Sequence, residues 1–137
     1  MKPHPYLRAY MAGIVIPTAF LLVILTGFTL ARYACDIPTP IERVIVFPMA
    51  VVPNVWGAWN MLWVLLRRRR ALPLGAHGAV LPLLLAPTGY AVARAVDFAI
   101  PAPVVAAAPF ALPAALALYY LVWKHLVGFF NELLGIS

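Results

Sequence analysis

Four long stretches of this chain contain no Lys, Arg, Asp or Glu, and this feature restricts the possible folds more than any other. The stretches cover residues 9–31, 44–66, 71–93 and 98–123. A helix needs about 20 mostly apolar residues to cross the hydrocarbon core of a bilayer. Backbone groups in lipid must bond within their own segment, so each stretch should be a helix and not a lone strand. The sequence therefore predicts an all-α integral membrane protein with four transmembrane helices in a single domain, residues 1–137.

Composition agrees with this prediction and argues against several classes of function. Of the 137 residues, 65% are hydrophobic and 10% are charged, whereas a soluble chain carries about 25% charged residues. The chain has no phosphate-binding glycine loop, no zinc-protease motif and no nucleophile elbow. We expect a non-enzymatic protein without a cofactor. Its positive charge is concentrated between spans, which argues against nucleic acid as a partner.

The distribution of positive residues predicts the orientation of the spans. Seven of the ten positive residues fall on one side of the predicted spans: Lys2, Arg8, the four arginines at 67–70, and Lys124. Arg32, Arg43 and Arg94 fall on the other side. Because cytoplasmic loops are enriched in Lys and Arg, we expect both termini of this multi-pass protein to be cytoplasmic, in a bacterial-type inner membrane.

The two halves of the chain resemble each other. Residues 26–32 read TGFTLAR and residues 88–94 read TGYAVAR, and each copy is followed by an Asp and then by Ile-Pro-x-Pro, at 37–40 and 100–103. Two predicted spans separate the copies, so both enter the membrane in the same direction. The pattern predicts a parallel internal repeat whose pseudo-twofold axis lies along the membrane normal.

Each repeat should form a helical hairpin, repeat one at 9–66 and repeat two at 71–131, giving two tandem hairpins. Proline removes a backbone donor and clashes with the preceding turn, so prolines inside a span predict kinked helices. The prolines expected to kink the spans are Pro17, Pro48, Pro53, Pro82, Pro87, Pro109 and Pro113. The kinks could open a central space or could simply be tolerated.

Charged residues recur at the outer end of each hairpin. Arg32 with Asp36, and Arg94 with Asp97, have the spacing of neighbours on a helix. We interpret each as a local ion pair at the membrane edge. A paired polar gate is the alternative.

The second span carries the best candidate for a ligand site. Trp56, Trp59 and Trp63 are spaced by three and four residues, so they form one helical stripe. Asparagines are costly in lipid unless bonded, so we expect those in this span to point into the bundle. The tryptophans, together with two tyrosines of span four, would form an aromatic wall, and the asparagines would add polar groups to it. Such a site suits a lipid, isoprenoid or quinone. The predicted ligand-binding residues are Asn54, Trp56, Trp59, Asn60, Tyr119 and Tyr120. An interfacial aromatic belt with helix-packing asparagines is the alternative.

Two histidines offer a less favoured interpretation. His77 lies early in span three and His125 late in span four, so both would be near the cytoplasmic face. Two axial imidazoles could hold a b-type haem. A metal site is not expected, because zinc needs three or four ligands and the lone Cys35 lies on the other side.

These patterns lead to two main hypotheses. In the first, the protein binds or transports a hydrophobic or amphipathic small molecule, and a homodimer would supply a transport path. Small residues at Gly57, Gly75, Gly78 or Gly89 could form the dimer contact. In the second, it is an accessory or assembly subunit of a larger membrane complex. Membrane lipids are partners in either case.

Overall fold

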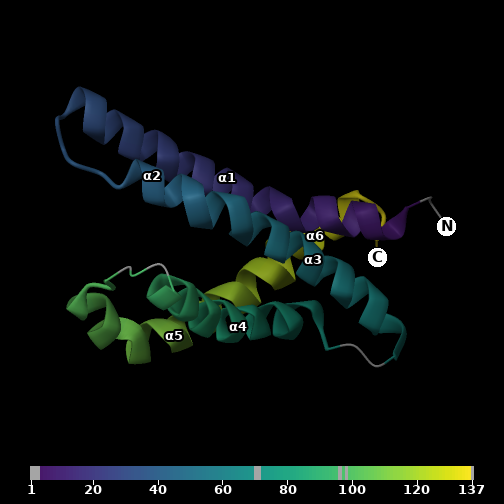
Figure 1. The fold of residues 1–137 in the computed structure, drawn as a ribbon. Coiled ribbons are helices and arrows are strands. Elements are labelled where there is room, and N and C mark those ends of the chain that lie inside the picture. Colours follow the sequence, from purple (N-terminus) through teal and green to yellow (C-terminus); the bar gives the residue numbers. More distant parts are fainter. Residues whose placement is uncertain (1–3, 70–71, 96, 98, 137) are drawn as a thin grey trace. The chain divides into compact units, whose positions relative to one another are not determined.

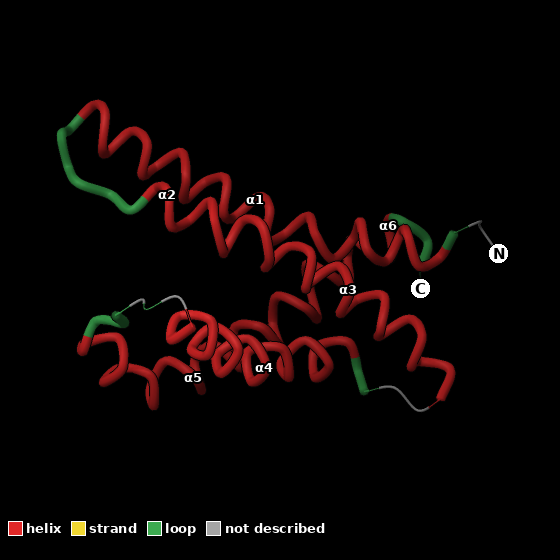
Figure 2. Tube along the Cα trace, in the orientation of Figure 1, coloured by secondary structure: helices red, strands yellow, loops and turns green. Residues whose placement is uncertain are grey.

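The computed structural model describes residues 4–69, 72–95, 97 and 99–136, and the regular structure in these ranges is all helical. The chain divides into two compact units. The first comprises Met1–Arg68 together with Phe129–Ser137, and the second comprises Arg69–Gly128. Figures 1 and 2 show helices joined by short connections.

The helices follow one another with few intervening residues. In chain order they are α1 (Pro5–Ala34), α2 (Ile41–Val44), the π-helical turn η1 (Ile45–Met49), α3 (Ala50–Leu66), the 3-10 turn η2 (Arg67–Arg69), α4 (Leu74–Ala95), α5 (Ala102–Val122), the π-helical turn η3 (Trp123–Val127) and α6 (Gly128–Leu133). Pro40 and Pro101, from the two Ile-Pro-x-Pro motifs, are the N-cap residues of α2 and α5. The motifs therefore start helices, since proline fixes φ and needs no donor partner there.

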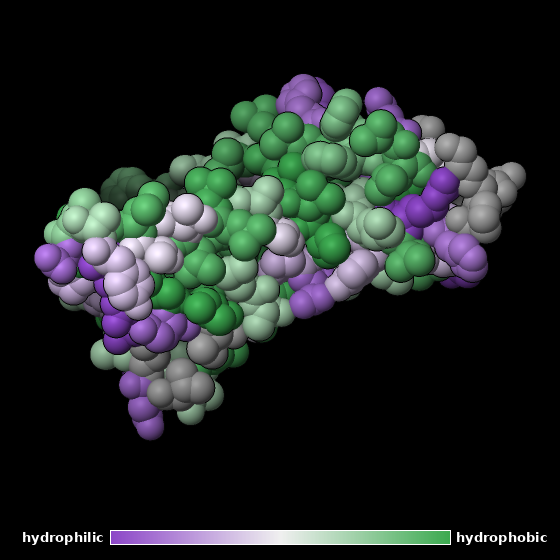
Figure 3. Space-filling model, turned by 90° about the horizontal axis from the view of Figure 1, so that it is seen from above, coloured by the Kyte–Doolittle hydropathy of each residue, from purple (hydrophilic) through white to green (hydrophobic). Residues whose placement is uncertain are grey.

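Three helices are long and apolar enough to cross a membrane: Pro5–Ala34, Leu74–Ala95 and the continuous run Ala102–Leu133. The apolar helix α3 is shorter, with 17 residues, and continues the helical run that starts at Ile41. Much of the face shown in Figure 3 is hydrophobic. Exposed apolar side chains over long helices are expected where a protein meets lipid, so the chain is a membrane-embedded helical protein.

In the first unit, α1 packs against α3 through one face of each helix (Figures 1 and 2). The buried residues of each face recur every three or four positions, as expected for a helix contact. On α1 they are Ala9, Ala12, Gly13, Pro17 and Leu21. On α3 they are Pro53, Trp56, Gly57, Asn60 and Val64.

The backbones of these two helices come close together at Gly13. A Cβ atom there would lie 2.7 Å from the carbonyl oxygen of Trp56 and 2.8 Å from the Cα of Gly57. Both atoms belong to the backbone, so they cannot move aside. Only glycine fits at this position, which explains why small residues mark the contact between the helices.

In the second unit, α4 packs against the chain from α5 into η3. The buried residues of α4 are Gly75, His77, Gly78, Leu81 and Pro82. Trp123 of η3 is fully buried, and a Cβ atom at Gly78 would overlap its indole. α5 contributes no buried residue. The buried side chains of this unit therefore gather around the Gly78 and Trp123 contact, and α5 packs on α4 without burying a residue completely.

Candidate functional site

Asn60 is fully buried and lies in the contact between α1 and α3. Its Nδ2 donates one hydrogen bond to the Ala9 carbonyl oxygen and one to Asn131 Oδ1, both at 2.7 Å. Asn131 Nδ2 donates back to Asn60 Oδ1 at 3.2 Å. Both hydrogens and the oxygen of the Asn60 amide are thus bonded inside the protein. This side chain holds the fold together and offers little to a ligand.

Asn131 belongs to the C-terminal segment, which packs on the first hairpin. The segment ends in a Schellman motif: Gly135 has φ 68°, its N–H bonds Glu132 O at 2.9 Å, and the Ile136 N–H bonds Asn131 O at 2.8 Å. Ile136 is 2% exposed and packs with Ala9 and Val64. The helix termination therefore places an apolar side chain in the core beside the paired amides.

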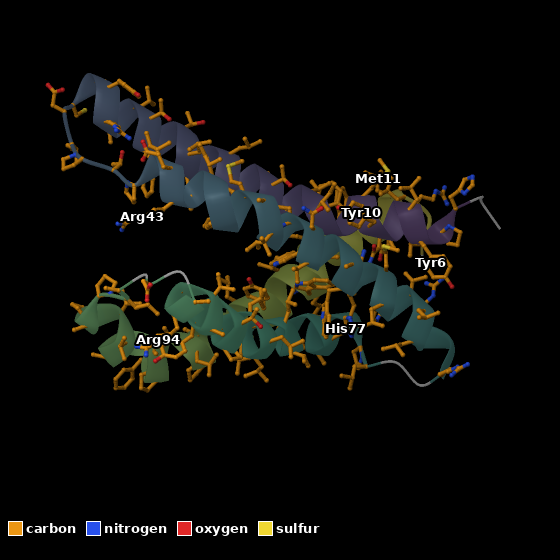
Figure 4. All side chains as sticks on the ribbon, in the orientation of Figure 1. Tyr6, Tyr10, Met11, Arg43, His77 and Arg94 are labelled. Atoms are coloured by element: carbon orange, nitrogen blue, oxygen red, sulfur yellow. The ribbon has the colours of Figure 1, made fainter. Side chains whose placement is uncertain are left out.

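Asn54 is exposed, so it lies outside the buried contact between α1 and α3. The Tyr10 hydroxyl donates a hydrogen bond to Asn54 Oδ1, and Asn54 Nδ2 donates to the Ala50 carbonyl oxygen at 2.7 Å. Figure 4 labels Tyr10 on α1, on the part of that helix that runs beside α3. The two side chains form an accessible polar pair on helices that are otherwise apolar.

The three tryptophans of α3 differ in environment. Trp56 lies in the buried stripe and is 4% exposed, whereas Trp59 and Trp63 are half-buried. The Arg67 guanidinium carbon lies 5.6 Å from the centre of the Trp63 ring. Of the predicted aromatic wall, Trp59 is thus accessible and Trp56 is part of the helix contact.

Tyr119 and Tyr120 lie at the end of α5, in the second unit. Tyr120 is 39% exposed, lies against Gly75, and has the Lys124 ammonium 5.8 Å from its ring centre. Tyr119 is half-buried. That these tyrosines complete a site with Trp59 and Asn60 stays a prediction.

The charged residues at the outer end of the first hairpin pair differently from the sequence interpretation. Arg32 bonds Glu42, with 2.7 Å between Nη1 and Oε1, and not Asp36. Bonding by its own backbone N–H and by Arg32 lowers the pKa of the Glu42 carboxyl below its usual value. Arg94 and Asp97, which both lie in the described ranges, form no ion pair with each other either.

Asp36 and Asp97 have a backbone role instead. Both follow the end of a long helix and have positive φ, 53° and 50°. Asp is among the few non-glycine residues that adopt the left-handed region readily. The Ile37 N–H then bonds the Ala31 carbonyl oxygen at 3.0 Å. The Arg and Asp pattern thus marks helix termination at both positions.

The two histidines differ in environment within the second unit. His77 is 5% exposed and meets Trp123 edge-on, with 6.1 Å between ring centres. His125 is exposed. Within the described ranges, no group of three or more His, Cys, Asp or Glu residues is placed to hold a metal ion.

Sequence reasoning missed three polar partners: Tyr10, Glu42 and Asn131. Asn131 lies outside the predicted site, yet it is polar and only 3% exposed. Its position four residues after Val127 and five before Ile136, both apolar, was the signal available in the sequence. Searches against protein-family models, curated proteins and solved structures find no match to this chain.

Proposed function

We propose that the chain is a four-span membrane protein made of two tandem, proline-kinked hairpins, with both termini in the cytoplasm. Repeat-equivalent positions support the parallel repeat. Gly13 and Gly78 each lie at a close helix contact, whereas Gly27 and Gly89 have no neighbour within 4 Å of an added Cβ. The left-handed aspartates after α1 and α4 are a further correspondence.

We propose that this protein binds or transports a hydrophobic or amphipathic small molecule without covalent chemistry. The observation that carries the proposal is the accessible Tyr10 and Asn54 pair on an apolar helix surface. An amide has two N–H groups, and the bond to Ala50 uses one of them. The second N–H can bond a carbonyl, hydroxyl or phosphate oxygen of the ligand.

The surroundings of this pair suit a ligand with an apolar body. Trp59 is half-buried and lies on the same helix as Asn54. A polar group in lipid is favourable only when bonded, so an exposed amide in an apolar helix favours a ligand that brings a polar group to it. Lipids, isoprenoids and quinones have this character.

The experiment is native mass spectrometry of the purified protein in mild detergent, with a short-chain quinone, an isoprenoid alcohol and a phospholipid offered in turn. Asn54→Leu and Tyr10→Phe should each reduce retention of the bound molecule about 5-fold or more, since each removes a hydrogen-bonding group. Thr29→Val is the matched control: Thr29 is exposed on α1, but its hydroxyl bonds Leu25 O in its own helix at 2.8 Å. Equal retention by all three folded variants would contradict the proposal.

An accessory subunit of a larger membrane complex is the second candidate. The observation in its favour is that α5 has no buried residue although it packs on α4, so most of its residues are exposed to lipid or to a partner helix. Gentle purification should then recover a second polypeptide in a fixed ratio. Gly57, Gly75 and Gly78 pack within their own hairpins, so a homodimer would have to use other small residues. Gly89 has no neighbour within 4 Å of an added Cβ, so it is available for such a contact.

A further inference from the structure

The two ends of the α1 and α3 hairpin differ in charge. At the outer end, Arg32 and Glu42 neutralise each other. The other two charged residues there, Asp36 and Arg43, have opposite charges, so the net charge of this end is zero. At the opposite end, where α1 begins and α3 ends, Arg8 and Arg67 have no carboxylate within ion-pair distance in the described part of the chain. Cations without a protein counterion at a membrane boundary attract the anionic headgroups of lipids.

The guanidinium of Arg67 is held in place by two contacts. It lies over the Trp63 ring at 5.6 Å, and its Nη1 donates a hydrogen bond to the Ile136 carbonyl oxygen. Ile136 packs with Ala9, the residue that follows Arg8. A guanidinium has five N–H donors, so most of the fork remains for a ligand. A fixed arginine loses less conformational entropy when it binds an anion than a freely moving one.

Trp63 indicates the depth of this group in the membrane. It is half-buried in the last turn of α3, and tryptophans concentrate at the level of the lipid headgroups. The anion present at that level is the phosphodiester of a phospholipid. Arginine matches phosphate oxygens with two parallel hydrogen bonds, which a diffuse surface charge does not provide.

We infer that Arg67 and Arg8 form a binding site for the headgroup of an anionic phospholipid, at the end of the hairpin where α1 begins. Arg67 binds the phosphate directly, and Arg8 adds a second positive charge from α1. Trp63 packs against the first carbons of an acyl chain. The site is separate from the Tyr10 and Asn54 pair and does not depend on the proposed function.

The experiment is native mass spectrometry of the full chain in detergent micelles that contain equal amounts of phosphatidylglycerol and phosphatidylcholine. The wild-type protein should retain phosphatidylglycerol in preference. Arg8→Gln and Arg67→Gln should each reduce this retention about 5-fold, the effect of about 1 kcal/mol per basic residue near an anionic lipid surface. The double variant should reduce it about 25-fold.

Arg94→Gln is the matched control, because it removes the same charge from an exposed residue in the last turn of α4. The Arg8 side chain has no hydrogen bond or ion pair to another described residue, so Arg8→Gln tests the site even if Arg67→Gln unfolds. The inference is overturned if Arg94→Gln has the same effect as Arg8→Gln, or if the two lipids are retained equally. Displacement of the lipid by millimolar inorganic phosphate would also overturn it, because the ligand would then be a free anion.

Discussion

Replacing Asn131 with leucine should destabilise the first hairpin by breaking the buried amide pair. The substitution keeps the number and branching of the side-chain heavy atoms but removes both hydrogen bonds that join it to Asn60. Asn60 keeps its bond to Ala9 O and is left with one N–H and its oxygen buried without partners. A buried polar group without a partner costs about 1–3 kcal/mol, and single hydrogen bonds measured in membrane proteins contribute up to about 1.7 kcal/mol.

From these values we expect Asn131→Leu to lower the free energy of unfolding by about 1–2 kcal/mol. The double variant Asn60→Leu with Asn131→Leu removes both amides and leaves only the Ala9 carbonyl, which keeps its bond within α1. It should be closer in stability to the wild type than either single variant. A double-mutant cycle should give a coupling of about 1–2 kcal/mol between the two positions.

The assay is unfolding in mixed micelles with an increasing fraction of dodecyl sulfate, followed by circular dichroism. Thr29→Val, whose hydroxyl bonds only within its own helix, sets the scale for an exposed polar change. The reasoning is refuted if the effects of the two single variants simply add in the double variant. Additivity would mean that the amides do not depend on each other, so that their pairing contributes nothing to stability.

Three further predictions concern packing and charge. Gly13→Ala should lower the unfolding free energy by about 1–3 kcal/mol, because the added methyl meets only backbone atoms of α3; the same micelle titration measures it. Gly78→Val should destabilise at least as much, since the valine would overlap a buried indole, whereas Gly89→Val should change little because that position is open; thermal unfolding of the two variants side by side distinguishes them. The pKa of the Glu42 carboxyl should lie below the usual value for glutamate and return toward that value in Arg32→Gln, because the Arg32 hydrogen bond is one cause of the lowering. The ion pair should contribute to stability above the usual glutamate pKa, and this contribution should be lost as the pH falls through the lowered pKa. Carbon chemical shifts of the carboxyl measure the titration.

The positions of the helices could be predicted from the sequence because charge and hydropathy act locally. Uncharged runs became helices, whereas Gly57 and Gly78, which were expected as possible dimer contacts, pack within their own hairpins. The hydrogen-bond and ion-pair partners of polar side chains were harder to predict, because one sequence spacing is compatible with several pairings. Arg32 could reach Asp36 within a helix, but the chain turns there and Glu42 offers its carboxylate instead.

The two asparagines of α3 show why the candidate site could be predicted only in part. A helix turns about 100° per residue, so positions six apart, such as Asn54 and Asn60, are separated by about 120° around the axis. Both cannot point into one interior site. Asn60 falls in the face that meets α1 and bonds there, while Asn54 falls outside it and is exposed. Asn54→Leu should therefore change ligand retention with little effect on unfolding, whereas Asn131→Leu should change unfolding and leave the Tyr10 and Asn54 pair intact.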